Sequence, residues 1–172
     1  MLSAPPCGLM IANAIAHLLA DPEQLAAARA DDALLANAIE ESLRLEPAAA
    51  VVDRYSTRAV ELAGAPIGER ELVVVSIAGA NRDPAVFPDP DRFDIRRANA
   101  RLHAAFAAGP HVCVGMHLAR LEAHTAVAQV FERLPGLRLD PEHRPAPRGL
   151  VFRKPDALRV RWDAPEGRRM PR

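Results

Sequence analysis

The sequence predicts a mainly α-helical fold that carries small β-sheets, an α+β architecture. Apolar residues recur at helical spacing in several segments, and the longest of these covers residues 114–134. The middle of the chain instead holds short β-branched runs between glycine turns, of which residues 72–77 are the strongest. Between these two regions, prolines at positions 84, 88 and 90 exclude a regular helix or a central strand from residues 81–93. We therefore expect a helical body with a small β insertion and one irregular surface segment.

The composition is that of an ordinary globular protein. Of its 172 residues, 49% are hydrophobic and 26% are charged, which excludes disorder of the whole chain. The formal net charge of +0 gives no reason to expect nucleic acid or an anionic membrane as a partner. The two cysteines, Cys7 and Cys113, lie far apart, which argues against a disulfide framework and favours a reducing cytoplasm. No secretory signal is evident, and the apolar run over residues 9–20 is too short for a membrane span.

Three helices are expected ahead of the β region, over residues 9–20, 22–30 and about 32–45. Two prolines, Pro5 and Pro6, stand just before the first helix, where an uninterrupted helix would not hold them. The second begins with an N-cap aspartate followed by proline, and the third follows an aspartate cap at position 31 or 32. A proline at position 47 ends the third helix.

Short strands are expected over residues 51–52, 57–62 and 72–77, separated by glycine turns. After the long helix, which a Pro-Gly pair ends, residues 137–162 read as short strands and turns. The last residues, 163–172, are expected to be a frayed terminus.

The segment with the clearest chemical potential is the cysteine loop, residues 106–115, with the sequence F-A-A-G-P-H-V-C-V-G. It is rich in Gly and Ala and leads directly into the long helix. Its small side chains leave space around Cys113, and the unpaired N–H groups at the helix start could donate to a thiolate there. A small buried hydrophobe, a zinc site with His111 and His117, and a nucleophile paired with His111 are the alternatives. No common zinc spacing matches, and no third orienting group is evident. An axial thiolate to haem iron, which needs one protein ligand and a slim loop, fits all the features.

A charged network is expected to support this loop. Glu41 and Arg44 lie three residues apart on a helix, so both side chains can point at one partner, whereas Glu40 beside them is expected to face solvent. The proline-rich segment needs side chains to hold it, and its Arg92 can bring a second guanidinium to the carboxylate. Glu41, Arg44 and Arg92 are therefore predicted to form a buried or half-buried structural ion network.

These features together resemble the haem-thiolate monooxygenases, the cytochromes P-450, and specifically their soluble bacterial type. Glu41-x-x-Arg44 looks like the family's E-x-x-R helix, and Asp53-Arg54 looks like its propionate-binding arginine before a strand. Residues 81–93 resemble the family's meander, with Arg92 completing a Glu–Arg–Arg triad. The cysteine loop resembles the haem-binding signature F-G-x-G-x-H-x-C-x-G. The resemblance covers residues 9–162.

The resemblance implies a haem (iron protoporphyrin IX) cofactor with Cys113 as its proximal iron ligand. It further implies that His111 and Arg54 contact the haem propionates, that Phe106 packs beside the thiolate, and that Gly109 and Gly115 give the backbone room. The implied reaction inserts one oxygen atom from O2 into a small organic substrate. Its electrons come indirectly from NAD(P)H through a ferredoxin-type donor. Arg101 and Arg120 are candidate docking contacts for that donor, although ordinary solvation explains both.

The chain also departs from the family it resembles. Family members are more than twice as long, so we expect the C-terminal haem-binding part of the fold, a single partial domain over residues 1–162, with the N-terminal half absent and a flexible tail at residues 163–172. A second chain could supply the missing half. Pro5 and Pro6 replace the acid–alcohol pair that delivers protons to bound oxygen. Ala107 replaces the first glycine of the signature, which is minor if its φ stays negative. The alternative functions are a non-catalytic accessory or binding protein of this family, and the remnant of a truncated gene.

Overall fold

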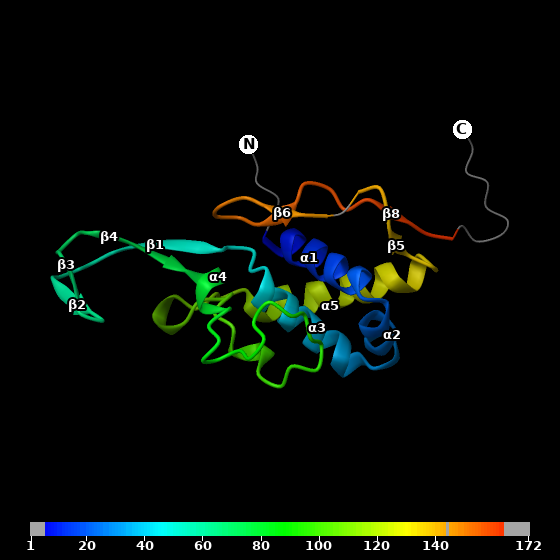
Figure 1. The fold of residues 1–172 in the computed structure, drawn as a ribbon, viewed down its shortest axis with the longest axis horizontal. Coiled ribbons are helices and arrows are strands. Elements are labelled where there is room, and N and C mark those ends of the chain that lie inside the picture. The colour runs from blue at the N-terminus through cyan, green and yellow to red at the C-terminus, as the bar shows by residue number, and fades with distance from the viewer. Residues whose placement is uncertain (1–5, 144, 164–172) are drawn as a thin grey trace.

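A computed structural model describes residues 6–143 and 145–163 and places four helices in one body (Figure 1). These helices are α1 (Pro6–Ala20), α2 (Pro22–Ala30), α3 (Asp32–Leu45) and α5 (Met116–Arg133). Helix α1 packs against both α3 and α5, and α2 packs against α3. Pro5 lies outside the described residues. Helix α1 begins at Pro6, because proline is tolerated at the first helical position, where its missing N–H would be unpaired in any case.

The helix starts follow from local side-chain caps. The Asp21 carboxylate accepts a hydrogen bond from the Gln24 N–H at 3.1 Å, and the proline that follows Asp21 opens α2. The Asp31 carboxylate likewise accepts from the Ala33 N–H at 2.9 Å, so Asp31 is the cap of α3. Each cap satisfies a backbone donor that the first turn of a helix leaves free.

A β arm, residues 51–76, projects from one end of the body (Figure 1). Its strands are β1 (Val51–Tyr55), β2 (Val60–Leu62), β3 (Ala65–Ile67) and β4 (Leu72–Ser76). Strands β1 and β4 pair antiparallel, with Arg54 opposite Val73, and β2 and β3 form a second hairpin at the tip. The short helix α4 (Ile77–Ala80) returns the chain from the arm to the body.

The remaining elements are short. They are the 3-10 turns η1 (Ala100–Leu102) and η2 (Gly109–His111) and the strands β5 (Arg138–Leu139), β6 (Pro147–Arg148), β7 (Lys154–Pro155) and β8 (Val160–Arg161). Strand β5 pairs with β8, and β6 pairs with β7. Of the expected tail at residues 163–172, all but Asp163 lies outside the described residues. No helix in the described ranges is both long enough and apolar enough to cross a membrane.

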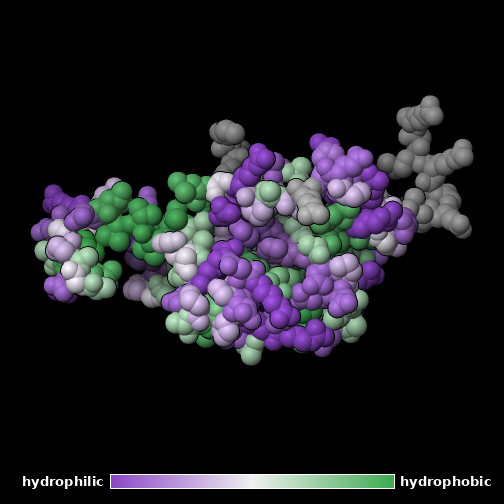
Figure 2. Space-filling view, viewed as in Figure 1, coloured by the Kyte–Doolittle hydropathy of each residue, from purple (hydrophilic) through white to green (hydrophobic). Residues whose placement is uncertain are grey.

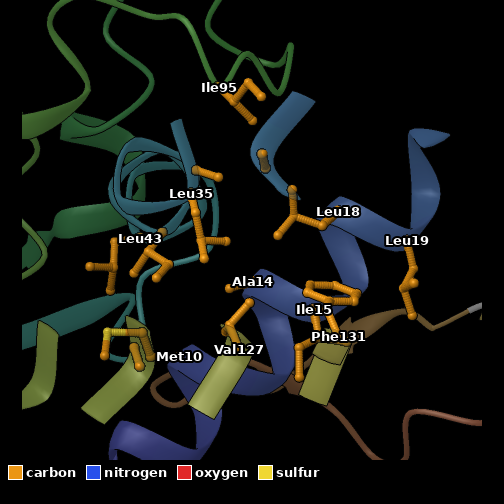
Figure 3. Packing of buried hydrophobic residues seen from close by; sticks show 14 of the residues in the cluster. Met10, Ala14, Ile15, Leu18, Leu19, Leu35, Leu43, Ile95, Val127 and Phe131 are labelled. Carbon is orange, nitrogen blue, oxygen red and sulfur yellow. The ribbon is translucent and has the colours of Figure 1, made fainter. Parts of the chain in front are cut away.

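The hydrophobic core lies where α1, α3 and α5 meet (Figure 3). Ala14 and Leu18 of α1 and Val127 of α5 are fully buried there, and Phe131 packs among them. The chain from the proline-rich segment adds Ile95 to the same cluster. This core fixes α1 against α5, the two helices that flank the cysteine loop.

Apolar side chains also gather outside the core. Figure 2 shows hydrophobic surface over the base of the β arm. On α5, Leu118 is 59% and Leu121 is 63% exposed, so this helix has an uncovered apolar face. Globular proteins rarely leave such faces open to water without a partner.

A half-buried histidine, His17 of α1, makes the stability of the body dependent on pH. His17 Nδ1 lies 2.9 Å from Ser42 Oγ, and its ring lies 5.1 Å from the ring of Phe93. Burial lowers the pKa of His17 from 6.5 to about 4. Because the folded pKa is the lower one, the contribution of neutral His17 is present above pH 6.5 and is lost as the pH falls towards 4.

We expect the free energy of unfolding to fall by roughly 3 kcal/mol over this pH window through His17 alone. Urea unfolding followed by circular dichroism at several pH values measures the slope. His17→Gln should flatten the slope, whereas His117→Gln, at an exposed position on α5, should leave it unchanged. An unchanged slope in His17→Gln would contradict the assignment.

Candidate functional site

The cysteine loop is closed on itself by a backbone hydrogen bond. The Cys113 N–H donates to the Phe106 carbonyl at 2.9 Å, and the Met116 N–H donates to the Cys113 carbonyl at 3.2 Å. Gly109 has a φ of +72°, a left-handed conformation that glycine adopts without strain. Gly115 has a φ of −88°, and a Cβ there would meet only the Cys113 sulfur, at 3.9 Å. Gly109 therefore serves the turn, and Gly115 keeps the space beside the sulfur open.

Ala107 corrects an expectation from the sequence. Its φ is +60° rather than negative, so this alanine occupies the left-handed region that favours glycine. A Cβ in this conformation crowds the following carbonyl oxygen. The substitution of the signature's glycine by alanine is thus a strained one.

Ala107→Gly is expected to stabilise the chain by about 0.5–1 kcal/mol. The strain that it removes is larger than the extra backbone entropy that glycine loses on folding. The adjacent Ala108 has a φ of −147°, so Ala108→Gly is the matched control and should destabilise slightly. Thermal unfolding of the two variants gives the comparison. Equal changes in both variants would show that Ala107 is not strained.

An apolar cavity of about 400 Å³ opens beside the cysteine loop, within the size range of small-molecule and cofactor sites. It collects five of the six residues that the family resemblance implied as cofactor contacts, all but Gly109. These five are Arg54, Phe106, His111, Cys113 and Gly115. Its other lining residues are mostly alanine and larger apolar side chains. They come from α1, α3 and the chain after it, β1, α4, residues 104–107, α5 and Phe152.

The polar groups of this cavity suit an anionic ligand. The Arg54 guanidinium donates to the Asp53 carbonyl at 2.8 Å, and in the part of the chain that the structure describes it meets no carboxylate. His111 lines the same cavity and is exposed to solvent, as is the Cys113 thiol. A flat apolar group that carries carboxylates and a metal able to accept a thiolate matches this set, and haem is such a group.

The structure does not favour the zinc alternative. Within the residues described, His111, Cys113 and His117 do not bring their ligand atoms into a common cluster. A tetrahedral site needs such a cluster.

Cys7 is a lining residue that sequence reasoning did not assign to the site. It lies on α1 and borders the same cavity as Cys113, and both thiols are free. Burial, together with a hydrogen bond to Glu122, raises the pKa of the Cys7 thiol. No sequence signal could have found this contact, since it depends on how α1 packs on α5.

The proline-rich segment is held by a buried ion pair. Both carboxylate oxygens of Glu41 accept from Arg44, at 2.8 and 2.9 Å, and neither side chain is exposed. The same guanidinium donates to the carbonyls of Asn81 and Pro90 and lies 5.2 Å from the ring centroid of Phe87. Arg44 thus pairs with one carboxylate and holds the irregular backbone.

The second arginine of this network is Arg97, which corrects the sequence-based choice of Arg92. Arg97 Nε donates to Glu41 Oε1 at 2.9 Å, and its other nitrogens hold the carbonyls of Pro88 and Asp89. Arg92 is exposed and contributes only its carbonyl, which accepts from both Arg44 and Arg97. The segment turns after Arg92, so the side chain that reaches the carboxylate comes from five residues further on.

Glu40 also differs from expectation, because it is buried rather than facing solvent. Arg120 donates to it twice, at 2.6 and 3.0 Å, and His103 Nε2 lies 3.0 Å from it. Burial raises the pKa of Glu40, but the hydrogen bonds from His103 and Arg120 outweigh it and lower the pKa to about 2. The Arg120 side chain is 27% exposed and is paired with Glu40, whereas Arg101 is 71% exposed, with its Nε 4.0 Å from the same carboxylate.

This fold and this site define a class of protein. A model of the cytochrome P450 family matches residues 14–155, and the chain belongs to that family. Among curated relatives, a cytochrome P450 monooxygenase (PikC) of Streptomyces venezuelae is 45% identical over 161 residues, which are 89% of this chain and 37% of the relative. Cytochrome P450 107B1 of Saccharopolyspora erythraea is 50% identical over 131 residues, which are 76% of this chain and 32% of the relative.

The solved structures agree with this assignment. Cytochrome P450 CYP109Q5 from Chondromyces apiculatus superposes with a TM-score of 0.86 at 36% identity, over 94% of this chain and 42% of that protein. The architecture is therefore part of the cytochrome P450 fold, as the sequence predicted. The chain spans about a third of the length of the curated relatives it matches.

Proposed function

We propose that this chain is the haem-ligating part of a haem-thiolate monooxygenase. The observation that carries the proposal is the convergence of Cys113, Arg54 and His111 on one apolar cavity. A cytosolic cysteine without such a role is usually a small buried hydrophobe, whereas Cys113 is exposed at the cavity. Membership of the cytochrome P450 family and the names of its relatives, a monooxygenase among them, support the same function.

Each residue has a distinct task in this proposal. Cys113 gives its thiolate to the haem iron, and the slim backbone at Gly115 leaves the sulfur accessible. Arg54 and His111 bind the two propionates, which need cationic or N–H partners when partly buried. Phe106 and the apolar lining pack beside the sulfur and the haem. Bound haem supplies the redox chemistry on O2 that places one oxygen atom in a small organic substrate, and a thiolate ligand favours O–O cleavage.

The test is reconstitution of the purified chain with haem. Wild-type protein should give the red-shifted Soret band of a reduced, CO-bound thiolate complex. Cys113→Ala should lose this band, and Cys7→Ala should keep it although Cys7 borders the same cavity. If wild-type protein binds no haem, the proposed function is wrong.

The proposal includes partners. Electrons come from NAD(P)H through a ferredoxin-type donor, with Arg101 as the exposed candidate contact. The open apolar face of α5, which includes Leu118 and Leu121, packs against the polypeptide that supplies the rest of the fold. Co-expression with the preceding portion of a relative tests this contact, since haem binding should then increase. A cytoplasmic location and a single partial domain over residues 1–162 stay predictions.

The second candidate is a non-catalytic accessory protein of the same family. The exposed apolar face of α5 favours it, because such a face suits a binding partner. In that case a partner would co-purify, no haem would be bound, and Cys113→Ala would change nothing. A remnant of a truncated gene would show neither partner nor haem.

A further inference from the structure

Glu40 and its partners form a second charged cluster, separate from the Glu41 network. The Glu40 side chain is 3% exposed and its two oxygens are shared between His103 and the fork of Arg120. Glu41, the next residue, faces the proline-rich segment instead. Two adjacent carboxylates of α3 therefore support two different parts of the chain.

The hydrogen bonds fix the tautomer of His103. Its Nδ1 accepts from the Ala105 N–H at 3.1 Å, so the ring proton lies on Nε2 and is donated to Glu40 at 3.0 Å. The opposite charges of the cluster are the Glu40 carboxylate and the Arg120 guanidinium, and Arg101 Nε lies 4.0 Å from the same carboxylate. The His103 side chain is 1% exposed, so the cluster is closed to water on this side.

Phe106 connects this cluster to the cysteine. The guanidinium carbon of Arg120 lies 4.8 Å from the Phe106 ring centroid, and the His103 ring lies 5.8 Å from it. The carbonyl of the same phenylalanine accepts the Cys113 N–H. The contacts thus run from Glu40 through Arg120 to Phe106, and from Phe106 to the backbone of Cys113.

We propose that Glu40, His103 and Arg120 are positioning residues for the Cys113 thiolate, acting through Phe106. A planar guanidinium held by a buried carboxylate is a rigid platform for an aromatic ring. A fixed ring fixes the carbonyl that receives the Cys113 N–H, and the groups that surround a ligand sulfur set its orientation and basicity. That Cys113 is a thiolate ligand rests on the proposed function. That these residues position the cysteine loop does not depend on it.

The experiment measures the loop first without haem. In a Cys7→Ser background, which leaves Cys113 as the only thiol, we follow its alkylation by iodoacetamide. Arg120→Gln should alkylate about tenfold faster, the change expected from loss of a charge-assisted hydrogen bond. Arg120→Lys keeps the positive charge but not the bidentate guanidinium, so its alkylation rate should lie between those of wild type and Arg120→Gln. Arg133→Gln, at an exposed position of the same helix, should match the wild-type rate.

The second readout is spectroscopic and uses the haem-loaded protein. Arg120→Gln and Glu40→Gln should shift the reduced-CO Soret band from the thiolate position towards that of a protonated thiol and should raise the reduction potential. If Arg120→Gln fails to fold, Phe106→Leu keeps the apolar volume, removes the stacking platform and should change both readouts in the same direction. Wild-type alkylation rates in folded Arg120→Gln or Phe106→Leu would overturn the proposal. If the variants still differ from wild type in alkylation rate but the protein binds no haem, only the proposed function is wrong.

Discussion

Replacing Glu41 by glutamine is expected to lower the free energy of unfolding by about 3–5 kcal/mol, because it leaves two buried guanidinium groups without a counter-charge. Arg44 is fully buried and the Arg97 side chain is 8% exposed, and both depend on this one carboxylate. A domain of this size is stable by only about 5–15 kcal/mol, so the change removes a large share of it. Urea unfolding followed by circular dichroism is the measurement.

Glu69→Gln is the matched control, since Glu69 is exposed on the β arm. Its free energy of unfolding should stay within about 0.5 kcal/mol of wild type. A Glu41→Gln variant that loses less than about 1 kcal/mol would show that the network is not the anchor of the proline-rich segment.

Phe131→Ala is expected to have an effect of similar size, about 3–5 kcal/mol, for a different reason. Phe131 is 3% exposed and lies in the core between α1 and α5 (Figure 3), so its truncation leaves a cavity that the rigid helices cannot close. Since α1 and α5 both line the cavity beside the cysteine loop, haem binding should weaken together with stability. Thermal unfolding and a haem titration on the same preparations measure the two effects.

Leu121→Ala serves as the control on the same helix. Leu121 is 63% exposed, so its truncation should cost little stability. If Phe131→Ala were no more destabilising than Leu121→Ala, the packing of α1 on α5 would not depend on this core.

The parts of the site that sequence reasoning could predict are those encoded locally. The cysteine loop and the i, i+3 pair of Glu41 and Arg44 are set by short-range spacing, and the structure gathers Cys113, His111 and Arg54 around one cavity. The helix caps and the β-branched run of β4 were likewise predictable, because they depend on neighbouring residues, whereas β1 extends to Tyr55 and β3 was not expected.

The missed features depend on how distant segments pack. Arg92 and Arg97 are both arginines in one irregular stretch, and only the path of its turns decides which reaches Glu41. Glu40 looked solvent-facing because its partners, His103 and Arg120, lie 63 and 80 residues away in sequence. The strain at Ala107 arises from its positive φ, and the residue type alone does not predict that angle.

The β arm has one more consequence, which concerns the lifetime of a bound group. A two-stranded ribbon is only marginally stable by itself, and β1 and β4 pair only with each other in the described structure. Arg54 sits on this ribbon, whereas Cys113 sits on the helical body. A ligand held by both residues joins the ribbon to the body, so local opening of the ribbon and escape of the ligand become linked events. We therefore expect binding to slow amide hydrogen exchange in β1 and β4, and ribbon opening to be one step on the path by which the ligand leaves.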